Sequence, residues 1–289
     1  MKILLLGKNG QVGWELQRTL TLLGEIIALG RQDLDLTDQQ TTRNTIRHIK
    51  PDLIVNAAAY TAVDKAEEEA ELAMAINGTA PGILAEEAAL LKATLVHYST
   101  DYVFDGTKNQ PYTEQDIPNP VNIYGKTKLA GEEAISQTEI PHLILRISWV
   151  YGTRRNNFLT AMLKLFEKKQ ELRVVNDQFG SPTWCRLIAE ATALVLAQNQ
   201  YFKKKNQGIY HLSASSDTTW YDFAINILEL YKAELQHLPL IRPIKTEDYP
   251  ALAARPRYSL LGGNKMFDKY NIQLPTWHEQ LKLALSSII

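Results

Sequence analysis

Short, uninterrupted apolar runs recur through the first half of the chain, and each is followed by a turn and a segment with helical spacing. These runs lie at residues 2–6, 26–30, 51–59 and 93–98. Strands that are buried on both faces of a parallel sheet have this continuous apolar character. Because the runs alternate with helical patterns, the sequence predicts an α/β fold built on a doubly wound parallel sheet.

The pattern loosens after residue 150, where turn-rich segments and a lysine run at 203–205, expected to be a solvated loop, interrupt it. We predict a Rossmann domain at 1–150, to which segments return from about 170–212. A smaller, discontinuous α/β substrate domain would occupy mainly 151–289. The other expected elements are helices at 64–75, 77–91, 158–168, 188–197 and 281–289, a helix opening at 218–223 and a strand at 208–212.

Composition and charge exclude several classes of protein. Lys plus Arg is 31 and Asp plus Glu is 32, so the net charge of −1 gives no sign of a nucleic-acid or membrane-surface partner. No apolar run is long enough to span a bilayer or to form a signal peptide. The one cysteine, Cys185, excludes a disulfide framework and suits a reducing compartment, so we expect a cytoplasmic protein.

A glycine-rich turn joins the first strand to the first helix. Gly7, Gly10 and Gly13 have the spacing G-x-x-G-x-x-G, in the strand–turn–helix context of a dinucleotide-binding turn. Gly7 permits the tight turn, Gly10 lets the backbone approach a pyrophosphate, and Gly13 lets helix and sheet pack closely. The N-terminus of the following helix would bind the anionic pyrophosphate. A plain strand-to-helix turn is the alternative. The Gly-Lys-Ser/Thr ending of an ATP-binding loop is missing, which disfavours ATP. The other candidate cofactor contacts in this turn are Asn9, Gln11 and Val12.

The ends of the next strands supply more candidate cofactor contacts. Arg31 follows the second strand, where an arginine suits a ribose 2′-phosphate, so NADPH is favoured and NADH stays possible. A solvated surface charge is the alternative for this arginine. Asp35 and Leu36 could flank an adenine ring, and small side chains at the end of the third strand would let a ligand lie flat, unless they pack a helix. The further candidates at these strand ends are Ala57, Ala58, Ala59, Tyr60, Thr61 and Tyr98.

Tyr124 and Lys128 are four residues apart in a helical segment and therefore share one face of a helix. A free phenol titrates near pH 10, and a neighbouring ammonium lowers that pKa toward the range of a general acid. Thr100 ends the fourth strand, where a hydroxyl is well placed to hydrogen-bond a substrate carbonyl, and Asp101 follows it. Taken alone, either segment could be an ordinary helix or an ordinary turn.

Two residues of the second half are candidates for substrate binding. Asn176 opens a turn-rich loop whose polar groups could meet a base or a sugar. Arg255 could hold a diphosphate through its planar fork, and a surface arginine is the alternative.

These motifs together resemble the extended short-chain dehydrogenases/reductases, and within them the dTDP-4-dehydrorhamnose reductase family. The resemblance extends from the first strand to the C-terminal helix, and it implies reduction of the 4-keto group of dTDP-4-dehydro-β-L-rhamnose to dTDP-β-L-rhamnose, a sugar donor for cell-surface polysaccharide. The second domain would bind the nucleotide sugar. The similar segments are 7–16, 55–59, 62–67, 97–104, 124–132 and 176–180.

The resemblance also implies a role for each residue of the site. The nicotinamide gives hydride to the carbonyl carbon, and Tyr124 gives a proton to its oxygen. Lys128 lowers the pKa of the phenol and hydrogen-bonds the nicotinamide ribose, while Thr100 polarises the carbonyl. Asp101 would touch the sugar, and Trp149 would lie against the sugar ring, with a core tryptophan as the alternative.

The chain departs from relatives that hold a magnesium ion between subunits through glutamates. Glu15 is present, but Arg186 stands where a second glutamate is expected, and a C-terminal glutamate is missing. We therefore predict no metal, and both a monomer and a homodimer stay open. Two other activities also stay open: another nucleotide-sugar short-chain reductase, epimerase or dehydratase, and a non-catalytic NADP(H)-binding regulatory subunit like that of methionine adenosyltransferase.

Overall fold

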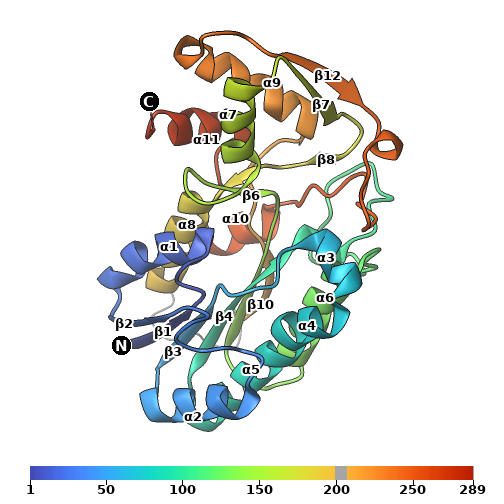
Figure 1. Cartoon of the computed structure of the whole chain (residues 1–289). Coiled ribbons are helices and arrows are strands. Elements are labelled where there is room, and N and C mark those ends of the chain that lie inside the picture. Colours follow the sequence, from blue (N-terminus) through green and yellow to red (C-terminus); the bar gives the residue numbers. More distant parts are fainter. Residues whose placement is uncertain (199–206, 289) are drawn as a thin grey trace.

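Two lobes make up the molecule (Figure 1). The computed structural model describes residues 1–198 and 207–288, so the lysine run at 203–205 lies outside the described residues. The larger lobe holds a six-stranded sheet with helices on both faces, and the smaller lobe holds short two-stranded sheets and helices. Within the described ranges, no helix combines the length and the apolar character needed to cross a bilayer.

The central sheet is parallel throughout, with the strand order β10-β5-β4-β3-β1-β2. This confirms the predicted doubly wound parallel sheet, and the strand predicted near 208–212 forms its edge. The strands are β1 (Lys2–Leu6), β2 (Glu25–Leu29), β3 (Leu53–Asn56), β4 (Thr94–Thr100), β5 (His142–Ile147) and β10 (Gly208–His211).

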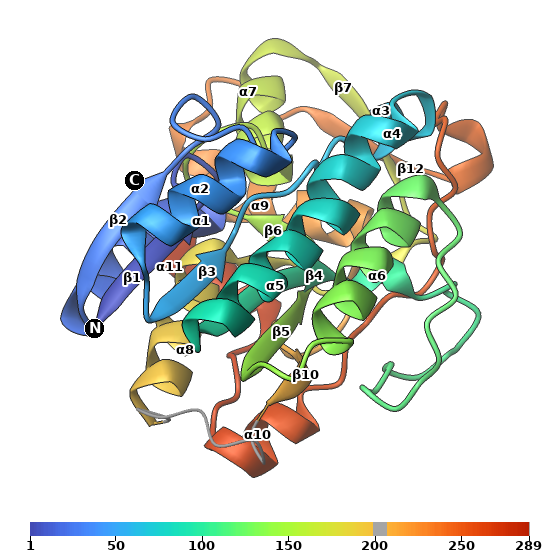
Figure 2. The ribbon, with the colours of Figure 1, turned by 90° about the horizontal axis from the view of Figure 1, so that it is seen from below.

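Helices cover the sheet on both sides (Figure 2). One hydrophobic core joins the sheet to α1 (Gln11–Thr19) and α8 (Cys185–Gln198). A second core joins the opposite face to α2 (Gln39–Ile49), α5 (Ala80–Leu91) and α6 (Ile123–Ser136). Alternate side chains of a strand point to opposite faces, so a strand between two helical layers must be apolar throughout.

The helical segments between β3 and β5 differ from the two predicted helices. The first predicted helix is interrupted at Glu69, whose φ of −112° and ψ of 43° are not helical. The second predicted helix, at 77–91, is not separated from the segment before it, because a π-turn at Ala75–Thr79 leads directly into α5. That turn contains the buried Asn77, whose side chain bonds both backbone groups of Tyr60, so a tertiary contact decides the local geometry. The intervening elements are α3 (Val63–Glu68), α4 (Ala70–Met74) and the short η3 (Asp101–Val103).

The second half of the chain contains both predicted and unpredicted elements. The helix predicted at 158–168 is confirmed as α7, the one at 188–197 starts earlier as α8, and the terminal one begins at Trp277 rather than 281. The sequence does not predict the parallel pair of strands β7 and β12, because these strands lie far apart in sequence and each has exposed positions. The elements here are α7 (Phe158–Lys168), α9 (Trp220–Tyr231), α10 (Asn264–Tyr270), α11 (Trp277–Leu285), β6 (Val150–Tyr151), β7 (Glu171–Val175), β8 (Phe179–Gly180), β9 (Thr183–Trp184), β11 (Thr218–Thr219) and β12 (Leu240–Ile244). Short helical turns lie at η1 (Leu20–Leu22), η5 (Lys232–Glu234) and η6 (Thr246–Asp248).

Candidate active site

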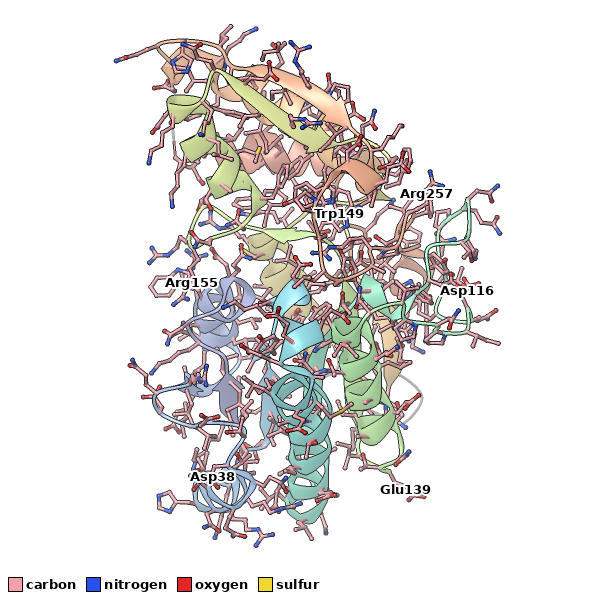
Figure 3. All side chains as sticks on the ribbon, turned by 45° about the vertical axis from the view of Figure 1, so that its right-hand side comes forward. Asp38, Asp116, Glu139, Trp149, Arg155 and Arg257 are labelled. Atoms are coloured by element: carbon pink, nitrogen blue, oxygen red, sulfur yellow. The ribbon has the colours of Figure 1, made fainter. Side chains whose placement is uncertain are left out.

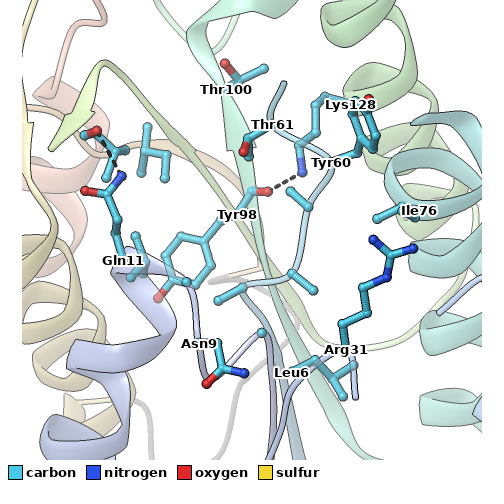
Figure 4. Close-up of a pocket in the computed structure, with 18 of the residues that line it drawn as sticks. Leu6, Asn9, Gln11, Arg31, Tyr60, Thr61, Ile76, Tyr98, Thr100 and Lys128 are labelled. Carbon is cyan, nitrogen blue, oxygen red and sulfur yellow. Dashed lines mark hydrogen bonds between the residues drawn. The ribbon is translucent and has the colours of Figure 1, made fainter. Parts of the chain in front are cut away.

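A cavity of about 980 Å³ opens at the carboxyl ends of β1 to β5 and reaches the start of the smaller lobe. Open α/β sheets bind ligands at this edge. Nineteen of the twenty-two predicted site residues line the cavity, and Gly13, Asn176 and Arg255 do not. Figure 4 shows a part of this lining. The predicted residues in the lining are Gly7, Asn9, Gly10, Gln11, Val12, Arg31, Asp35, Leu36, Ala57, Ala58, Ala59, Tyr60, Thr61, Tyr98, Thr100, Asp101, Tyr124, Lys128 and Trp149.

The glycine turn fits closely against the end of β3. Gly7 has a φ of +85°, and a Cβ built on it would lie 2.6 Å from the backbone nitrogen of Ala58. A Cβ on Gly13 would lie 2.1 Å from the Gly7 carbonyl oxygen, so α1 could not pack as it does against the turn. Gly13 therefore shapes the cavity without lining it, as its predicted packing role requires.

The start of α1 suits the anionic part of a dinucleotide. The helix begins after Gly10, and no side chain caps its first N–H groups. Such a helix N-terminus carries a partial positive charge and free donors, which together favour a pyrophosphate. The Gln11 side chain donates from Nε2 to the Val150 carbonyl at 3.4 Å, while its buried Oε1 accepts no hydrogen bond among the described residues (Figure 4). The chain thus offers backbone and side-chain groups for such a ligand, and the residues fit the predicted cofactor.

Arg31 lies at the end of the cavity that β2 borders (Figure 4). Its side chain is 75% exposed, and its Nε lies 3.8 Å from a carboxylate oxygen of Asp35. A salt bridge this exposed contributes little stability, so the guanidinium can turn toward a phosphate at small cost. Leu36 is buried next to this pair and offers an apolar surface.

The wall formed by Ala57–Ala59 and the next two residues is held from outside the cavity. Asn77 Oδ1 accepts from the Tyr60 backbone N–H at 2.8 Å, and Asn77 Nδ2 donates to the Tyr60 carbonyl at 3.0 Å. The same Nδ2 also donates to the Thr127 hydroxyl of α6 at 3.2 Å. One buried amide therefore couples this wall to the helix that carries Tyr124.

Tyr124 and Thr100 lie together at the centre of the cavity. Burial raises the pKa of Tyr124 to about 12, against a hydrogen bond with the Thr100 hydroxyl, which lowers it. This shift is opposite to the predicted one, because desolvation penalises the phenolate more than its surroundings stabilise it. Gly125 lets the helix approach this closely, since a Cβ there would lie 2.1 Å from the Tyr102 carbonyl oxygen.

Lys128 lines the cavity but bonds to the sheet rather than to Tyr124. Its Nζ donates to the Tyr98 carbonyl at 2.6 Å and lies 3.2 Å from His97 Nε2 (Figure 4). The side chain is fully buried, and burial lowers the pKa of Lys128 to about 8, with Glu132 opposing the shift. Lys128 is not among the groups that shift the pKa of Tyr124 in this structure, so its effect on the phenol stays a prediction.

Asp101 and Trp149 lie where the two lobes meet. The Asp101 carboxylate accepts hydrogen bonds from Thr100 at 3.1 Å, from Ser148 at 3.0 Å and from Ser259 at 2.6 Å. Burial nevertheless raises the pKa of Asp101 to about 6. The Trp149 indole lies between the lobes (Figure 3), stacked on Trp220 with ring centroids 3.6 Å apart. Its φ of +43° is unusual for a bulky residue, and such strain clusters at functional sites.

Arg255 and Asn176, both predicted to bind substrate, lie outside the cavity. Arg255 forms a bidentate ion pair with Asp64, with distances of 3.0 and 2.7 Å, and also donates to the Ala253 carbonyl. Its fork geometry therefore already joins the lobes in this structure, and the diphosphate contact stays a prediction. Asn176 donates its backbone N–H to the Ile244 carbonyl, and its buried Oδ1 has no partner among the described residues.

Glu15 is surrounded by cations. It pairs with Arg18, and its carboxylate lies 3.5 Å from Arg186 Nε, the residue that stands where a second glutamate was expected. Within 1–198 and 207–288, no cluster of three or more His, Cys, Asp or Glu side chains is arranged to hold a metal ion. The absence of a metal stays a prediction. Cys185 is buried nearby, and burial raises the pKa of its thiol to about 12, which suits an inert side chain.

Sequence reasoning missed part of the site. The loop after β6 brings Arg155, Asn156 and Asn157 to the cavity, although nothing in its spacing indicated this position. Asn56 and His97 lie immediately behind the lining; Asn56 ends β3, whereas His97 lies inside β4. A polar residue at the carboxyl end of an apolar strand was therefore the signal that could have found Asn56.

Comparisons with known proteins agree with this geometry. The family model described as RmlD substrate binding domain matches residues 1–289. The chain is 43% identical to a dTDP-4-dehydrorhamnose reductase of Burkholderia thailandensis and 44% identical to one of Escherichia coli strain K12, over 100% of this chain and 99% and 98% of those proteins. It is similar, with a TM-score of 0.90 and 34% identity over 99% of both chains, to a dTDP-4-dehydrorhamnose reductase of Bacillus anthracis whose crystal structure contains NADP.

Proposed function

This chain belongs to the dTDP-4-dehydrorhamnose reductase family, and we propose that it reduces the 4-keto group of dTDP-4-dehydro-β-L-rhamnose to give dTDP-β-L-rhamnose. The observation that carries this proposal is the shared lining of one cavity. Thr100, Tyr124 and Lys128 lie in it together with a glycine turn suited to a dinucleotide. A hydride donor, a proton donor and a ketone can therefore occupy one enclosed space.

The cofactor proposed is NADPH, which supplies the hydride for the carbonyl carbon when it is bound. The uncapped start of α1 would hold its pyrophosphate, and Arg31 would turn toward the 2′-phosphate. Asp35 and Leu36 would flank the adenine, and Ala57–Ala59 would let the cofactor lie against the sheet edge. The remaining contacts proposed are Asn9, Gln11, Val12, Tyr60, Thr61 and Tyr98.

Tyr124 would donate the proton that the reduced oxygen needs. Its raised pKa keeps the phenol protonated at neutral pH, which is the form that can act as an acid. Thr100 would donate a hydrogen bond to the same oxygen as negative charge develops there. Lys128 would bond the nicotinamide ribose, since its Nζ lies at the cavity wall beside the Tyr98 carbonyl.

The smaller lobe would bind the nucleotide sugar. Trp149 offers an aromatic face at the junction and Asp101 a buried carboxylate, both next to the proposed proton donor. We propose the division into a cofactor domain at 1–150, with the returning strand β10, and a sugar domain at mainly 151–289. A cytoplasmic location and a monomeric or dimeric state stay predictions.

The test is consumption of NADPH by the purified chain, followed by the loss of reduced-nicotinamide absorbance. We expect one NADPH to be oxidised for each dTDP-4-dehydrorhamnose, and none without the sugar. An epimerase or dehydratase would convert a nucleotide sugar with no net loss of NADPH. A regulatory subunit would bind NADPH and show no turnover with any sugar, and that result would overturn the proposal.

A further inference from the structure

The loop between β6 and α7 faces the start of α1 across two adjoining cavities. One is the cavity of about 980 Å³, and the other is a smaller one of about 330 Å³. Four residues line both cavities, and these are Asn9, Gly10, Gln11 and Arg155. The first three belong to the glycine turn and the first position of α1, whereas Arg155 comes from the loop (Figure 3). The fold therefore places an arginine against the point where the helix begins.

Polar side chains at the start of α7 fix the backbone of this loop. Asn157 Nδ2 donates to the carbonyls of Gly152 and Arg154 at 2.8 and 3.1 Å. The Thr160 hydroxyl donates to the Arg155 carbonyl at 2.7 Å. Arg155 has a φ of +62°, a left-handed conformation that a long L side chain rarely adopts. The surrounding hydrogen bonds, and not the Arg155 side chain, therefore hold the loop in this position.

The Arg155 guanidinium is exposed and has no counter-charge. Its neighbour Arg154 lies over the ring of Trp14 in α1, with 4.0 Å between the guanidinium carbon and the ring centroid. Glu15, the carboxylate that lines the smaller cavity, is buried and already pairs with Arg18 and lies near Arg186. Within the ranges that the structure describes, the Arg155 side chain forms no hydrogen bond and no ion pair. It is thus free to bind a ligand.

The start of α1 makes an unpaired cation unfavourable at this place. The first N–H groups of the helix have no side-chain cap, and this end of the helix carries a partial positive charge. The helix and Arg155 therefore direct positive charge into the same space, which is repulsive in the absence of an anion. A phosphate group between them would accept from the backbone N–H groups and from the planar guanidinium.

We propose that Arg155 binds the pyrophosphate of the dinucleotide, opposite the N–H groups at the start of α1. The inference rests on the proposed cofactor and adds a contact that the glycine turn does not provide. NADPH and NADH share the pyrophosphate, so Arg155 should strengthen the binding of both without selecting between them. That selection is proposed for Arg31, at the β2 end of the cavity. Because Arg155 belongs to the loop that leads into α7, the bound cofactor would also tie this loop to the sheet edge.

A nucleotide sugar also carries a diphosphate, but the position of Arg155 favours the dinucleotide. The smaller cavity that Arg155 lines is bounded by α1, through Trp14 and Glu15, and by the loop itself. The groups proposed to meet the sugar line only the larger cavity, and these are Thr100, Asp101, Tyr124 and Trp149. The diphosphate at the start of α1 is therefore that of the cofactor.

Equilibrium binding to the purified full chain tests this contact without turnover. Arg155→Asn removes the charge, and asparagine tolerates a positive φ. We expect the Kd for NADPH and the Kd for NADH to rise by the same factor of about ten, on the scale of one charge-assisted hydrogen bond. The difference from wild type should shrink as the salt concentration rises, since exposed charges are screened. Unchanged Kd values for both cofactors would overturn the proposal. So would a loss confined to NADPH, because it would place Arg155 at the 2′-phosphate.

Arg154→Gln is the matched control, because it removes the same charge from the neighbouring residue, whose guanidinium lies on Trp14. Both Kd values should stay within about twofold of wild type. An equal loss in Arg154→Gln and Arg155→Asn would reject the specific contact, since the net charge of the loop would then explain it. Arg155→Gly should show the same loss as Arg155→Asn, and it serves as the test if the asparagine variant does not fold, because glycine adopts this φ without strain.

Binding of dTDP separates the two sources of diphosphate. In Arg155→Asn the Kd for dTDP should stay within about twofold of the wild-type value. A loss of dTDP affinity with unchanged NADPH affinity would overturn the proposal and assign Arg155 to the nucleotide sugar. A failure of the proposed reductase function appears elsewhere, in the wild-type assay with sugar, where bound NADPH would not be oxidised. The comparison of Kd values does not depend on that result.

Discussion

The carboxyl edge of the six-stranded sheet and the junction between the lobes build the cavity in different ways. At the sheet edge, backbone geometry dominates: the positive φ of Gly7 and the contact of Gly13 with the turn shape the wall. At the junction, single side chains do this work across long sequence separations. Asp101 bonds Ser259 at 2.6 Å, and Arg255 bonds Asp64.

The two regions should therefore respond differently to substitutions. At the sheet edge, which is built from consecutive backbone turns, a substitution should act mainly through steric collision. At the junction, which is built from buried polar contacts, a substitution should act by leaving a polar group unpaired or by changing a protonation state.

Tyr124→Phe removes the proposed proton donor at the sheet edge and leaves the backbone as it is. Acid catalysis is worth about 10²–10⁴-fold, so kcat should fall by roughly that factor while the Kd for NADPH stays nearly constant. Steady-state kinetics and a cofactor titration check both numbers. Tyr102→Phe is the control, because that ring packs edge-to-face on Tyr124 at 5.9 Å but does not line the cavity. Retained activity in Tyr124→Phe would contradict the role.

Asp101→Asn tests the protonation state at the junction. Burial raises the pKa of Asp101 from an ordinary 3.8 to about 6, against hydrogen bonds from Ser259 and Ser148. Because the folded protein holds this proton more tightly than the unfolded chain, the stability contributed is complete below 3.8 and is lost as the pH rises through about 6.

Relative to Asp101→Asn, the wild-type free energy of unfolding should therefore fall by about 2 kcal/mol between about pH 4 and pH 7. Urea denaturation of both proteins across this range measures the difference. A difference that is independent of pH would show that the carboxyl has an ordinary pKa.

Gly13→Ala tests steric failure at the sheet edge. The added Cβ would lie 2.1 Å from the Gly7 carbonyl oxygen, so α1 must move away from the turn. We expect a loss of about 1–3 kcal/mol in stability, together with weaker NADPH binding. Gly263→Ala, where nothing lies within 4 Å of the added atom, should change neither quantity. Thermal unfolding and a cofactor titration distinguish the two variants.

Arg31→Asp tests the cofactor end of the sheet edge. Its side chain is 75% exposed, so the fold should be unaffected, while the proposed 2′-phosphate contact turns from attraction to repulsion. We expect the preference for NADPH over NADH to fall by about tenfold, on the scale of one charged hydrogen bond. The ratio of the two Kd values measures it, and an unchanged ratio would reject the contact.

Arg255→Gln should have the smallest effect, and on stability rather than on ligand binding. Its partner Asp64 is 43% exposed, so the loss of the ion pair should cost about 1 kcal/mol or less. The Kd for dTDP, measured by calorimetry, should stay within about twofold of the wild-type value. This is a small change, since about 1.4 kcal/mol corresponds to a tenfold change in Kd. A large loss of dTDP affinity would support the predicted contact between Arg255 and the diphosphate.

The sheet, the glycine turn and most of the cavity lining follow from the pattern of residues along the chain. Apolar runs place the strands, and the carboxyl ends of parallel strands must meet at one edge, so Gly7, Ala57 and Thr100 converge without further information. The four-residue spacing of Tyr124 and Lys128 likewise fixes a common helix face. These inferences need only the periodicity of regular structure.

The positions of charges and protons depend on the tertiary structure. The pKa of Tyr124 rises because burial outweighs its neighbours, and Lys128 turns to the Tyr98 carbonyl and His97. Arg255 is engaged by Asp64, a partner 191 residues away. Desolvation and long-range pairing depend on which surfaces the fold brings together, and local sequence spacing carries no record of that.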